Sequence, residues 1–298
     1  MDASNPKYKD APQQVKSLSE ALAKSHSKSG YSETITAEML STQKLSQNGE
    51  PVSLREHIIE LADKAIKLNP SFAYPHVAKG RAFVRASMYE NANTEIDLAL
   101  AIDPTISAGI FLRADIFRRT KNITEAHKYY LQFINSNPNP QRKANAYYWI
   151  AKMHSDATYY CEEAERKSLL ALARTAYEQN LKFSPDSAWG NVNFSIFLNG
   201  FEADFDNAER YAKRALDLME FKMARYHLAA AQYQKIWRNM SQLSDSAIND
   251  EITKVALSTN ISLTSAIEFE TLGTLIRVRL SDLQLRTQGW KVKTELNH

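Results

Sequence analysis

Apolar positions recur along this chain at three- and four-residue steps, which is the spacing of amphipathic helices rather than of strands. The stretch LALAIDPTISA, residues 98–108, shows how these runs are separated: one stops at Asp103-Pro104 and another starts almost at once. Proline lacks an amide proton and disfavours helical geometry in the residue before it, yet it suits the opening turn of a following helix. The pair therefore predicts the end of one helix and the start of the next.

Such joints recur at a fixed distance. Leu68-Asn69-Pro70, Ile102-Asp103-Pro104 and Ser136-Asn137-Pro138 are spaced 34 and 34 residues apart, and Phe183-Ser184-Pro185 follows 47 residues later. A stop and restart every 34 residues marks the joint between helical hairpins. We therefore expect an all-α chain in which helix pairs follow one another in series.

Within this period the chain resembles the tetratricopeptide-repeat family, whose pattern is W-x2-L-G-x2-Y, then A-x3-F, then P. Two units, residues 73–106 and 107–140, place residues at the family's offsets: Gly80, Phe83, Ala92, Ile96, Ala99 and Pro104, then Ile110, Ala114, Phe117, Ala126, Tyr130 and Pro138. His76 replaces the tryptophan, and Lys79 and Arg113 stand where leucine is usual. The resemblance implies an α-solenoid of about five to six helical hairpins with helical N- and C-terminal flanks.

The later units differ in length and register. The fourth is 47 residues long, and its excess over the 34-residue period falls around residues 155–168. Because this stretch is rich in helix formers, we expect longer helices in the fourth hairpin rather than a long loop. The fifth unit carries Ala208, Ala212 and Ala215 one residue out of strict register, and Ala230 and Tyr233 indicate a sixth first helix.

The repeats then occupy residues 54–238, between an N-terminal helical flank over 1–53, which could include a degenerate repeat, and a C-terminal helical cap over 239–298. We expect helices over 246–258 and 262–287. One face of the second is apolar and should dock on the hairpin that contains Tyr233: Ala266, Phe269, Leu272, Ile276, Leu280 and Leu283. Leu275 and Val278 lie off this face, so self-association through the C-terminal helix is an alternative to simple capping.

Composition limits the function without choosing one. With 37 basic and 34 acidic residues the net charge is +3, too weak to argue for nucleic acid by itself. Cys161 is the only cysteine, which excludes an intrachain disulfide and fits a reducing compartment. The first residues lack the apolar core of a secretory signal, and no run approaches the roughly 18 apolar residues that span a bilayer. We expect a cytoplasmic protein without membrane insertion.

Catalytic motifs are largely missing. The sequence has no Gly-rich phosphate loop, no G-x-S-x-G elbow and no H-E-x-x-H, and its seven histidines are not paired at helical ligand spacing. Glu162, Glu163 and Glu165 could suggest a carboxylate cluster, but at a helix start they complement the positive end of the helix dipole. No motif around Cys161 would activate its thiol. We therefore expect no enzyme activity, catalytic residue, cofactor or metal.

The resemblance also implies where a partner would bind. In tetratricopeptide proteins the first helices of successive hairpins line a concave groove through their second, fifth, sixth and ninth positions. The matching residues, with Arg118 one turn further along, form what we call the implied groove: Tyr74, Val77, Arg81, Phe111, Leu112, Asp115, Arg118, Arg142, Asn145, Trp149, Trp189, Val192, Asn193 and His227. Tryptophan, tyrosine and arginine often dominate interface energetics. Trp149 and Trp189 could instead pack between hairpins.

Some family members hold the C-terminal carboxylate of heat-shock chaperones with a clamp of lysine, asparagine and arginine. The matching positions here carry Val77, Arg81, Leu112, Arg142 and Ala146. Most of them depart from the clamp, so we do not expect that ligand.

These features favour a non-enzymatic protein-binding scaffold or adaptor, which captures a peptide or partner protein by aromatic contacts and by arginine pairing with carboxylates. Its natural partner segment contains acidic and bulky apolar residues. Two alternatives stay open. Helical-hairpin repeats can also bind single-stranded RNA, against which the near-neutral charge counts. An enzyme site could also lie between the repeats and the flanks.

Overall fold

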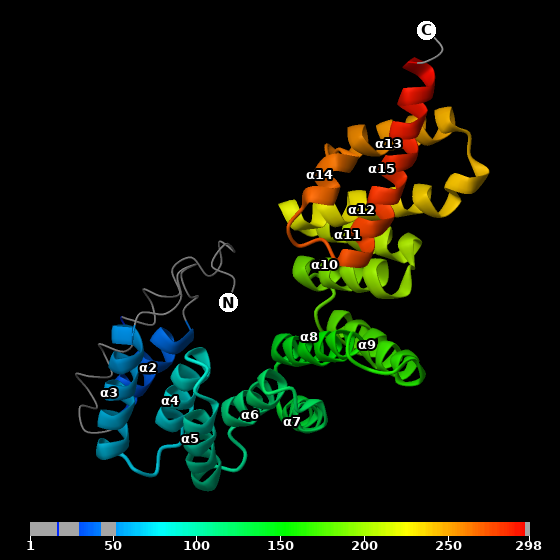
Figure 1. The fold of residues 1–298 in the computed structure, drawn as a ribbon. Helices are drawn as coiled ribbons and strands as arrows, with labels where there is room; N and C mark the ends of the chain where they lie inside the picture. The colour runs from blue at the N-terminus through cyan, green and yellow to red at the C-terminus, as the bar shows by residue number, and fades with distance from the viewer. Residues whose placement is uncertain (1–16, 18–29, 43–51, 296–298) are drawn as a thin grey trace. The chain divides into compact units, whose positions relative to one another are not determined.

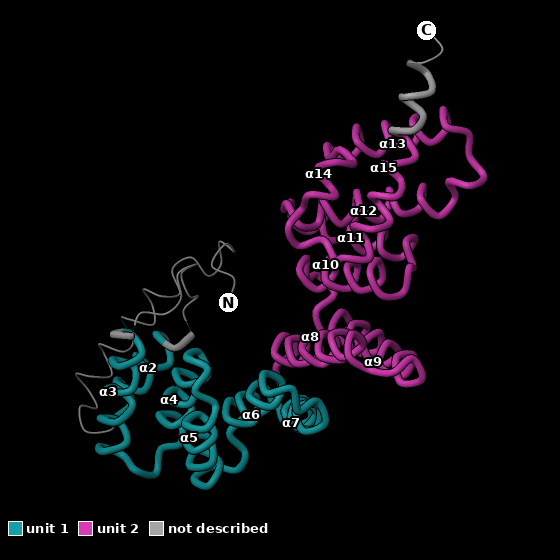
Figure 2. The backbone as a smooth tube through the Cα atoms, in the orientation of Figure 1, with its two compact units in different colours: residues 1–138 teal, residues 139–298 magenta. Residues whose placement is uncertain are grey.

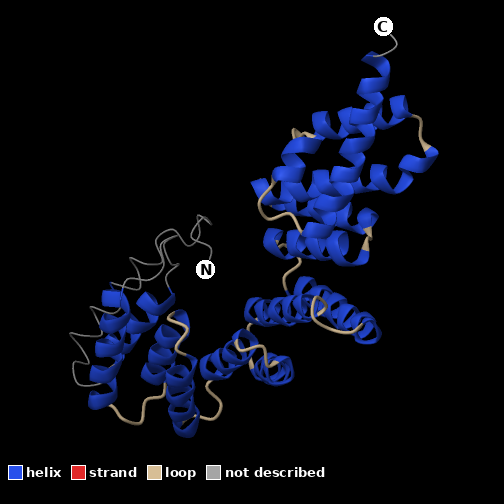
Figure 3. Cartoon of the chain, viewed as in Figure 1, coloured by secondary structure: helices blue, strands red, loops and turns tan. Residues whose placement is uncertain are grey.

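The computed structural model describes residues 17, 30–42 and 52–295, and these residues form helices, turns and no strand (Figure 3). The chain divides after Pro138 into two compact units, unit 1 over residues 1–138 and unit 2 over residues 139–298 (Figure 2). Most of the N-terminal flank expected before residue 54 lies outside the described residues. The all-α class and the solenoid of helical hairpins are confirmed.

The described residues of unit 1 include three helix pairs in series (Figure 1). The pairs are α2 (Tyr31–Thr42) with α3 (Val52–Leu68), α4 (Tyr74–Arg85) with α5 (Tyr89–Ile102), and α6 (Ser107–Arg119) with α7 (Ile123–Ser136). The first helices also pack on one another, α2 against α4 and α4 against α6. They therefore form one layer of unit 1, which is the layer that carries the implied groove residues.

The proline joints act as the sequence predicts. Asp103 ends α5 in an extended conformation, with φ −135° and ψ 96°, and Asn137 ends α7 with φ −94° and ψ 126°. The Asp103 carboxylate accepts hydrogen bonds from the amide and the hydroxyl of Thr105, at 2.9 and 2.7 Å. Both joints thus place an extended residue before proline, and at Asp103 local hydrogen bonds replace the lost helical ones.

The turn inside each hairpin repeats as well. Ser87 and Lys121, 34 residues apart, both adopt left-handed backbone angles, with φ of 59° and 62°. The residue after each donates its amide proton to the carbonyl of Phe83 or Phe117 at 2.9 Å, a bond that closes the end of the first helix. The two hairpins therefore share a turn that the family pattern does not specify.

Lys79 and Arg113, which stand where the repeat pattern has leucine, each form an ion pair with an aspartate. Lys79 Nζ lies 2.9 Å from Asp63 Oδ1, and the Arg113 guanidinium contacts the Asp97 carboxylate. Both pairs join residues 16 apart, and the second repeats the first 34 residues later. Each pair links the second helix of one hairpin to the first helix of the next. Charged residues thus replace the usual leucine because the neighbouring hairpin supplies an aspartate.

His76, which replaces the usual tryptophan, is also paired. Its Nδ1 lies 2.7 Å from Glu95 Oε2, and both residues are buried. Lys79 Nζ approaches the other oxygen of Glu95 at 2.9 Å. Burial by itself would raise the pKa of Glu95, but the bonds from His76 and Lys79 hold this pKa below its usual value. A polar group inside the second hairpin therefore replaces the apolar contact of the pattern.

Unit 2 contains the three remaining helix pairs and the cap. The pairs are α8 (Pro140–Ala157) with α9 (Glu163–Phe183), α10 (Ala188–Phe197) with α11 (Phe205–Leu218), and α12 (Lys222–Asn239) with α13 (Asp245–Thr259). Within the segment 239–298 that was expected to form the cap, α13 pairs with α12, and α14 (Leu263–Glu268) and α15 (Thr274–Glu295) follow. We keep the name cap for α14 and α15. A π-helix, η2 (Leu198–Glu202), extends α10, and a 3₁₀ turn, η3 (Met240–Gln242), follows α12.

The extra residues of the fourth unit lengthen its helices, as predicted. Helices α8 and α9 have 18 and 21 residues, whereas α6 and α7 have 13 and 14. Only the short segment 158–162 joins α8 to α9. Tyr159 and Tyr160 in this turn are 66% and 84% exposed.

The π-helix accounts for the register of the fifth unit. A π turn closes its hydrogen bonds over five residues instead of four, so it absorbs one additional residue without breaking the helix. Residues 198–202 lie between the first-helix and second-helix parts of this unit, where the register slips by one. The turn ends at Ala203, which is left-handed at φ 56° and ψ 27°.

The cap docks where the sequence predicts. Ala266, Phe269, Leu272, Ile276, Leu280 and Leu283 are all buried in one cluster with Tyr233. The Tyr233 hydroxyl donates a hydrogen bond to the carbonyl of Ile261 at 2.7 Å. Leu275 and Val278 remain 47% and 59% exposed, as expected for residues off the docking face.

The expectation of one continuous helix over 262–287 is wrong. Helix α14 ends at Glu268 and α15 starts at Thr274, with Phe269 extended at ψ 119°. The Arg277 guanidinium donates hydrogen bonds to the carbonyls of Phe269 and Leu272, at 2.7 and 2.9 Å. These bonds satisfy carbonyl groups that the break leaves without helical partners. The side chains of Phe269 and Leu272 are both buried in the core of the cap.

Candidate partner-binding surfaces

In unit 1 the implied groove residues differ widely in exposure. Tyr74, at the start of α4, is 44% exposed, whereas Val77 and Leu112 are buried in the core between hairpins. The Arg81 guanidinium on α4 contacts the Glu38 carboxylate on α2, so this pair joins two first helices. Tyr74 therefore presents most of the apolar surface among these residues.

Helix α6 uses its implied groove residues mainly within the protein. The Phe111 ring packs edge-on against Tyr130 and Phe133 of α7, with centroids 5.5 and 5.0 Å apart. Asp115 forms ion pairs with Arg118, three residues on, and with Arg119 at 2.8 Å. Phe111 thus helps to close its own hairpin, and the charge of Arg118 is already balanced.

In unit 2 several implied groove residues are accessible. Arg142 and Asn145 on α8 are exposed, and Trp149 is half-buried against the edge of Tyr148, with centroids 4.9 Å apart. Trp189 on α10 is 45% exposed although its ring contacts Phe221 at 4.9 Å.

Val192 and Asn193, the other two implied groove residues on α10, are held in place. The Asn193 amide donates a hydrogen bond to the Trp189 carbonyl at 2.7 Å, while Val192 is fully buried. Trp189 therefore keeps an accessible ring on a locally ordered helix.

His227 does not belong to an accessible surface. Its side chain is completely buried in α12, and the Phe269 ring of the cap stands edge-on to it at 6.1 Å. Neither ring nitrogen has a hydrogen-bond partner among the described residues, and burial lowers the pKa of His227 to about 4. The implied groove role is therefore wrong for His227 in this structure, because the cap and the core enclose the ring.

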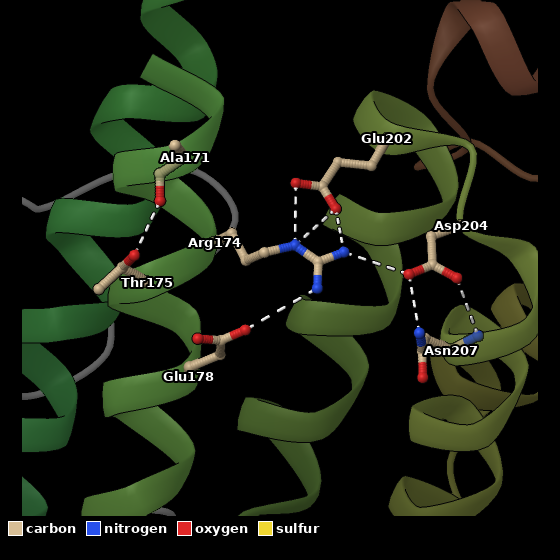
Figure 4. A network of polar contacts seen from close by, with 7 residues as sticks. All are labelled: Ala171, Arg174, Thr175, Glu178, Glu202, Asp204 and Asn207. Carbon is tan, nitrogen blue, oxygen red and sulfur yellow. Dashed lines mark hydrogen bonds and ion pairs between the residues drawn. The ribbon is translucent and has the colours of Figure 1, made fainter. Parts of the chain in front are cut away.

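A polar network in unit 2 was not apparent from the sequence. The Arg174 guanidinium on α9 binds both carboxylate oxygens of Glu202 at the end of the π-helix, and one oxygen of Asp204 at 3.1 Å (Figure 4). The bonds to Glu202 raise the pKa of Arg174, so it stays charged. The partners lie 28 and 30 residues away in the chain, and no local pattern connects them.

The same network fixes the start of α11. Asp204 accepts a hydrogen bond from the Asn207 amide at 3.3 Å as the N-cap residue. Burial alone would raise the pKa of Asp204, but the bonds from Asn207 and Arg174 hold this pKa below its usual value. Arg174 therefore fastens the fourth hairpin to the turn that follows the π-helix.

A second arginine fastens the cap. Arg279 on α15 donates to the Gln234 side chain at 2.8 Å and to the carbonyl of Asn199 in the π-helix at 3.3 Å. Its guanidinium also lies 5.4 Å from the Trp237 ring centroid. Burial lowers the pKa of Arg279, and no carboxylate pairs with it in the described part of the chain.

The three glutamates and the cysteine considered as possible reactive groups in the fourth hairpin lie at or just before the start of α9. Helix α9 starts at Glu163, with Glu163 and Glu165 in its first turn and Glu162 as the N-cap residue. Cys161 is partly buried, and its thiol contacts the Thr158 carbonyl at 3.7 Å. Over the described residues, no group of three or more His, Cys, Asp or Glu side chains could hold a metal ion, and no helix has both the length and the apolarity needed to cross a membrane.

Comparison with known proteins shows a shared fold. No protein-family model matches the chain, and no curated protein matches it. PilF of Pseudomonas aeruginosa is 13% identical with a TM-score of 0.52, over 96% of this chain and 98% of that one. A human IFIT1 dimer with PPP-AAAA is 11% identical with a TM-score of 0.56, over 95% and 67%.

YrrB, described as a TPR protein with an unusual peptide-binding site, is 16% identical over 69% of this chain and 94% of that one, with a TM-score of 0.44. At such identities these likenesses concern the arrangement of helices alone.

Proposed function

Because the chain has the helical-hairpin fold of tetratricopeptide-repeat proteins, we propose that it is a non-enzymatic protein-binding scaffold or adaptor. The observation that carries the proposal is Trp189, a large ring that stays 45% exposed while its neighbours Val192 and Phe194 are buried. An accessible tryptophan on an ordered helix is a common anchor of protein interfaces. The scaffold captures a peptide or partner protein on the first helices of its hairpins, and we place it in the cytoplasm.

The chemistry of unit 2 supports a partner segment with acidic and bulky apolar residues. Arg142 is exposed and has no carboxylate partner within the described residues. Lys222, at the start of α12, is also exposed and lies 5.5 Å from the centroid of the Tyr226 ring, again without a carboxylate. Such cations gain more from a partner's carboxylate than already paired arginines do, and Trp189 offers contact area for an apolar side chain.

The test is a matched pull-down. Arg142→Ala, Asn145→Ala and Trp189→Ala combined should reduce recovery of partner proteins from native extract, quantified by mass spectrometry, relative to the unmodified chain. Tyr160→Ala, which removes a more exposed ring from the fourth hairpin, is the control and should leave recovery unchanged.

Circular dichroism and melting of all variants should agree, because each altered side chain is exposed. Equal recovery by a folded triple variant would refute the proposal, and loss of folding would show that these residues belong to the core.

A single-stranded RNA-binding function is the second candidate. Arg142 and Lys222, which have no carboxylate partner among the described residues, and the exposed ring of Trp189 favour it, since phosphate neutralisation and base stacking need such side chains. The net charge of +3 provides little long-range attraction for a polyanion. Oligoadenylate retention that falls steeply between low and physiological salt, and that the triple variant loses, would support RNA over protein.

A further inference from the structure

The guanidinium of Arg279 uses only one of its two hydrogen-bonding edges within the protein. Its Nη1 donates to the Gln234 side chain at 2.8 Å and to the carbonyl of Asn199 at 3.3 Å. The other edge, formed by Nε and Nη2, makes no hydrogen bond to a described residue, and the protein does not enclose it. Arginine binds a carboxylate through two such parallel N–H groups. We call Nε and Nη2 the open edge of Arg279.

Two aromatic rings hold this guanidinium in place. Its carbon lies 5.4 Å from the ring centroid of Phe205 and 5.4 Å from that of Trp237. The Phe205 ring belongs to the core, since the residue is only 1% exposed. Together with the two bonds from Nη1, these cation–π contacts fix the direction of the open edge before a ligand arrives. A preformed donor pair of this kind loses little conformational entropy on binding.

The positive charge of Arg279 has no counterion in the described part of the chain. The side chain is half-buried, as are Arg113 and Arg174, but each of those two contacts a carboxylate. Asp282, the nearest acidic residue along α15, instead accepts a hydrogen bond from Trp237 Nε1 at 2.8 Å. A half-buried cation without a counterion gains more from a carboxylate than a fully solvated one does, because the surrounding dielectric constant is lower.

The surrounding charges indicate a ligand with one negative charge. Lys235 Nζ lies 2.8 Å from the Asp206 carboxylate and 2.9 Å from that of Glu209, and the Arg238 guanidinium lies 3.4 Å from Asp206. These cations are therefore already balanced, and Asp282 adds a negative charge to the same region. A phosphate group carries about two negative charges, and a nucleic acid strand needs several unpaired cations. One unpaired guanidinium matches one carboxylate.

Exposed apolar side chains accompany the open edge along α15. Leu275, four residues before Arg279, is 47% exposed, and the adjacent Val278 is 59% exposed. Residues four apart lie on one face of a helix, so a ligand that reaches the open edge also meets Leu275. Apolar groups packed around an ion pair exclude water and strengthen it. The ligand that fits is therefore a peptide in which an acidic residue has bulky apolar neighbours.

We propose that the open edge of Arg279 binds an acidic side chain of a partner peptide, with Leu275 and Val278 packing on the apolar residues beside it. None of these three residues belongs to the implied groove. The proposal rests on the proposed function for the existence of a peptide partner. Its test uses peptides of known sequence, so either proposal can fail without the other.

The experiment measures binding of a short peptide to the full chain by fluorescence anisotropy. The peptide is Gly-Leu-Glu-Leu-Gly, blocked at both ends and labelled with an uncharged fluorophore, and its match carries Gln in place of Glu. The Glu peptide should bind saturably, and the Gln peptide should bind about tenfold more weakly, because a hydrogen bond to a charged acceptor is stronger than one to a neutral acceptor. Free glutarate, which has the carboxylate without the apolar neighbours, should compete only weakly.

A substitution one turn from Arg279 provides a matched pair of variants. Leu275→Glu places a carboxylate four residues before Arg279, which is the favourable orientation for an ion pair on a helix. It should occupy the open edge and bind the Glu peptide about tenfold more weakly than Leu275→Gln, which has the same size without the charge. Arg279→Lys keeps the charge but loses the two parallel N–H groups, so it should lose the preference for Glu over Gln. If Arg279→Lys melts early, the two Leu275 variants decide.

Leu257→Glu is the control for net charge, because it makes the same change at an 80% exposed leucine of α13. It should bind the Glu peptide as the unmodified chain does, and so should the variant that combines Arg142→Ala, Asn145→Ala and Trp189→Ala. Loss of binding in that triple variant would assign the peptide to the implied groove and overturn this proposal alone. Absence of saturable binding, equal affinity for the two peptides, equal binding by the two Leu275 variants, or glutarate binding as tightly as the peptide would also overturn it.

Discussion

The buried histidine of α12 makes unit 2 sensitive to acid. His227 is fully buried, neither ring nitrogen has a hydrogen-bond partner in the described part of the chain, and burial lowers its pKa from 6.5 to about 4. The folded state therefore binds its proton more weakly than the unfolded chain does. The contribution of the neutral His227 to the free energy of unfolding is therefore fully present above pH 6.5 and is lost as the pH falls from 6.5 to about 4.

The size of the effect follows from that difference. At about 1.4 kcal/mol for each pH unit, the full loss amounts to about 3 kcal/mol, of which about 2 kcal/mol falls between pH 7 and pH 5. His227→Leu removes the titrating group at similar volume and breaks no hydrogen bond to any residue that the structure describes. We expect the variant to lack this part of the pH dependence and to be at least as stable at pH 7.

Urea unfolding at pH 7, 6 and 5, followed by tryptophan fluorescence, measures this difference. All four tryptophans lie beyond residue 138, so the signal reports on unit 2 and excludes His127 of unit 1, whose pKa burial also lowers. The exposed His57→Gln is the control and should follow the unmodified chain. Parallel pH profiles for the unmodified chain and His227→Leu would refute the reasoning.

Three further changes test the contacts that hold the hairpins together. Arg174→Ala should destabilise unit 2 by about 1 kcal/mol, a modest value because the side chain is partly exposed. Arg174→Lys should not restore this stability, since lysine cannot bind both oxygens of one carboxylate as the guanidinium does. The urea midpoints of the two variants and the unmodified chain measure the difference. Glu95→Ala should cost about 2 kcal/mol because it leaves the buried His76 without its acceptor and removes one of the two carboxylates that bind Lys79. An unchanged melting temperature would contradict the importance of this network. Deleting residues 260–298 should lower the melting temperature and cause aggregation by exposing Tyr233 and its cluster, whereas conversion of a dimer into a stable monomer, seen by light scattering, would instead show self-association through the C-terminal helix.

Local chemistry determined the helical hairpins and their lengths. The joints at Asp103 and Asn137 depend on the proline that follows each, whose geometric restriction acts within one or two residues. The apolar face of the cap is likewise a periodic property of its own segment, which is why the buried set around Ile276 and Leu280 could be predicted. The same holds for the longer helices α8 and α9.

The implied groove could be predicted only in part. The repeat register assigns a position on a helix, but it does not say which neighbour covers that position. Trp189 stays 45% exposed although its ring contacts Phe221, whereas Phe111 packs on Tyr130 and Phe133, and His227 is buried beside Phe269. Exposure is a property of the packed hairpins rather than of the helix that carries the residue.

Tertiary structure alone decided the contacts between distant segments. Arg174 reaches Glu202 across 28 residues of sequence, and the rings of Tyr31, Phe72 and Tyr74 lie in contact across two hairpins. The break before α15 likewise depends on Arg277 satisfying the carbonyls that it opens. Hydrogen bonds and ring contacts of this kind act over a few ångströms, so they exist only after the chain has brought its segments together, whereas helix periodicity and proline restriction operate along the chain before it folds.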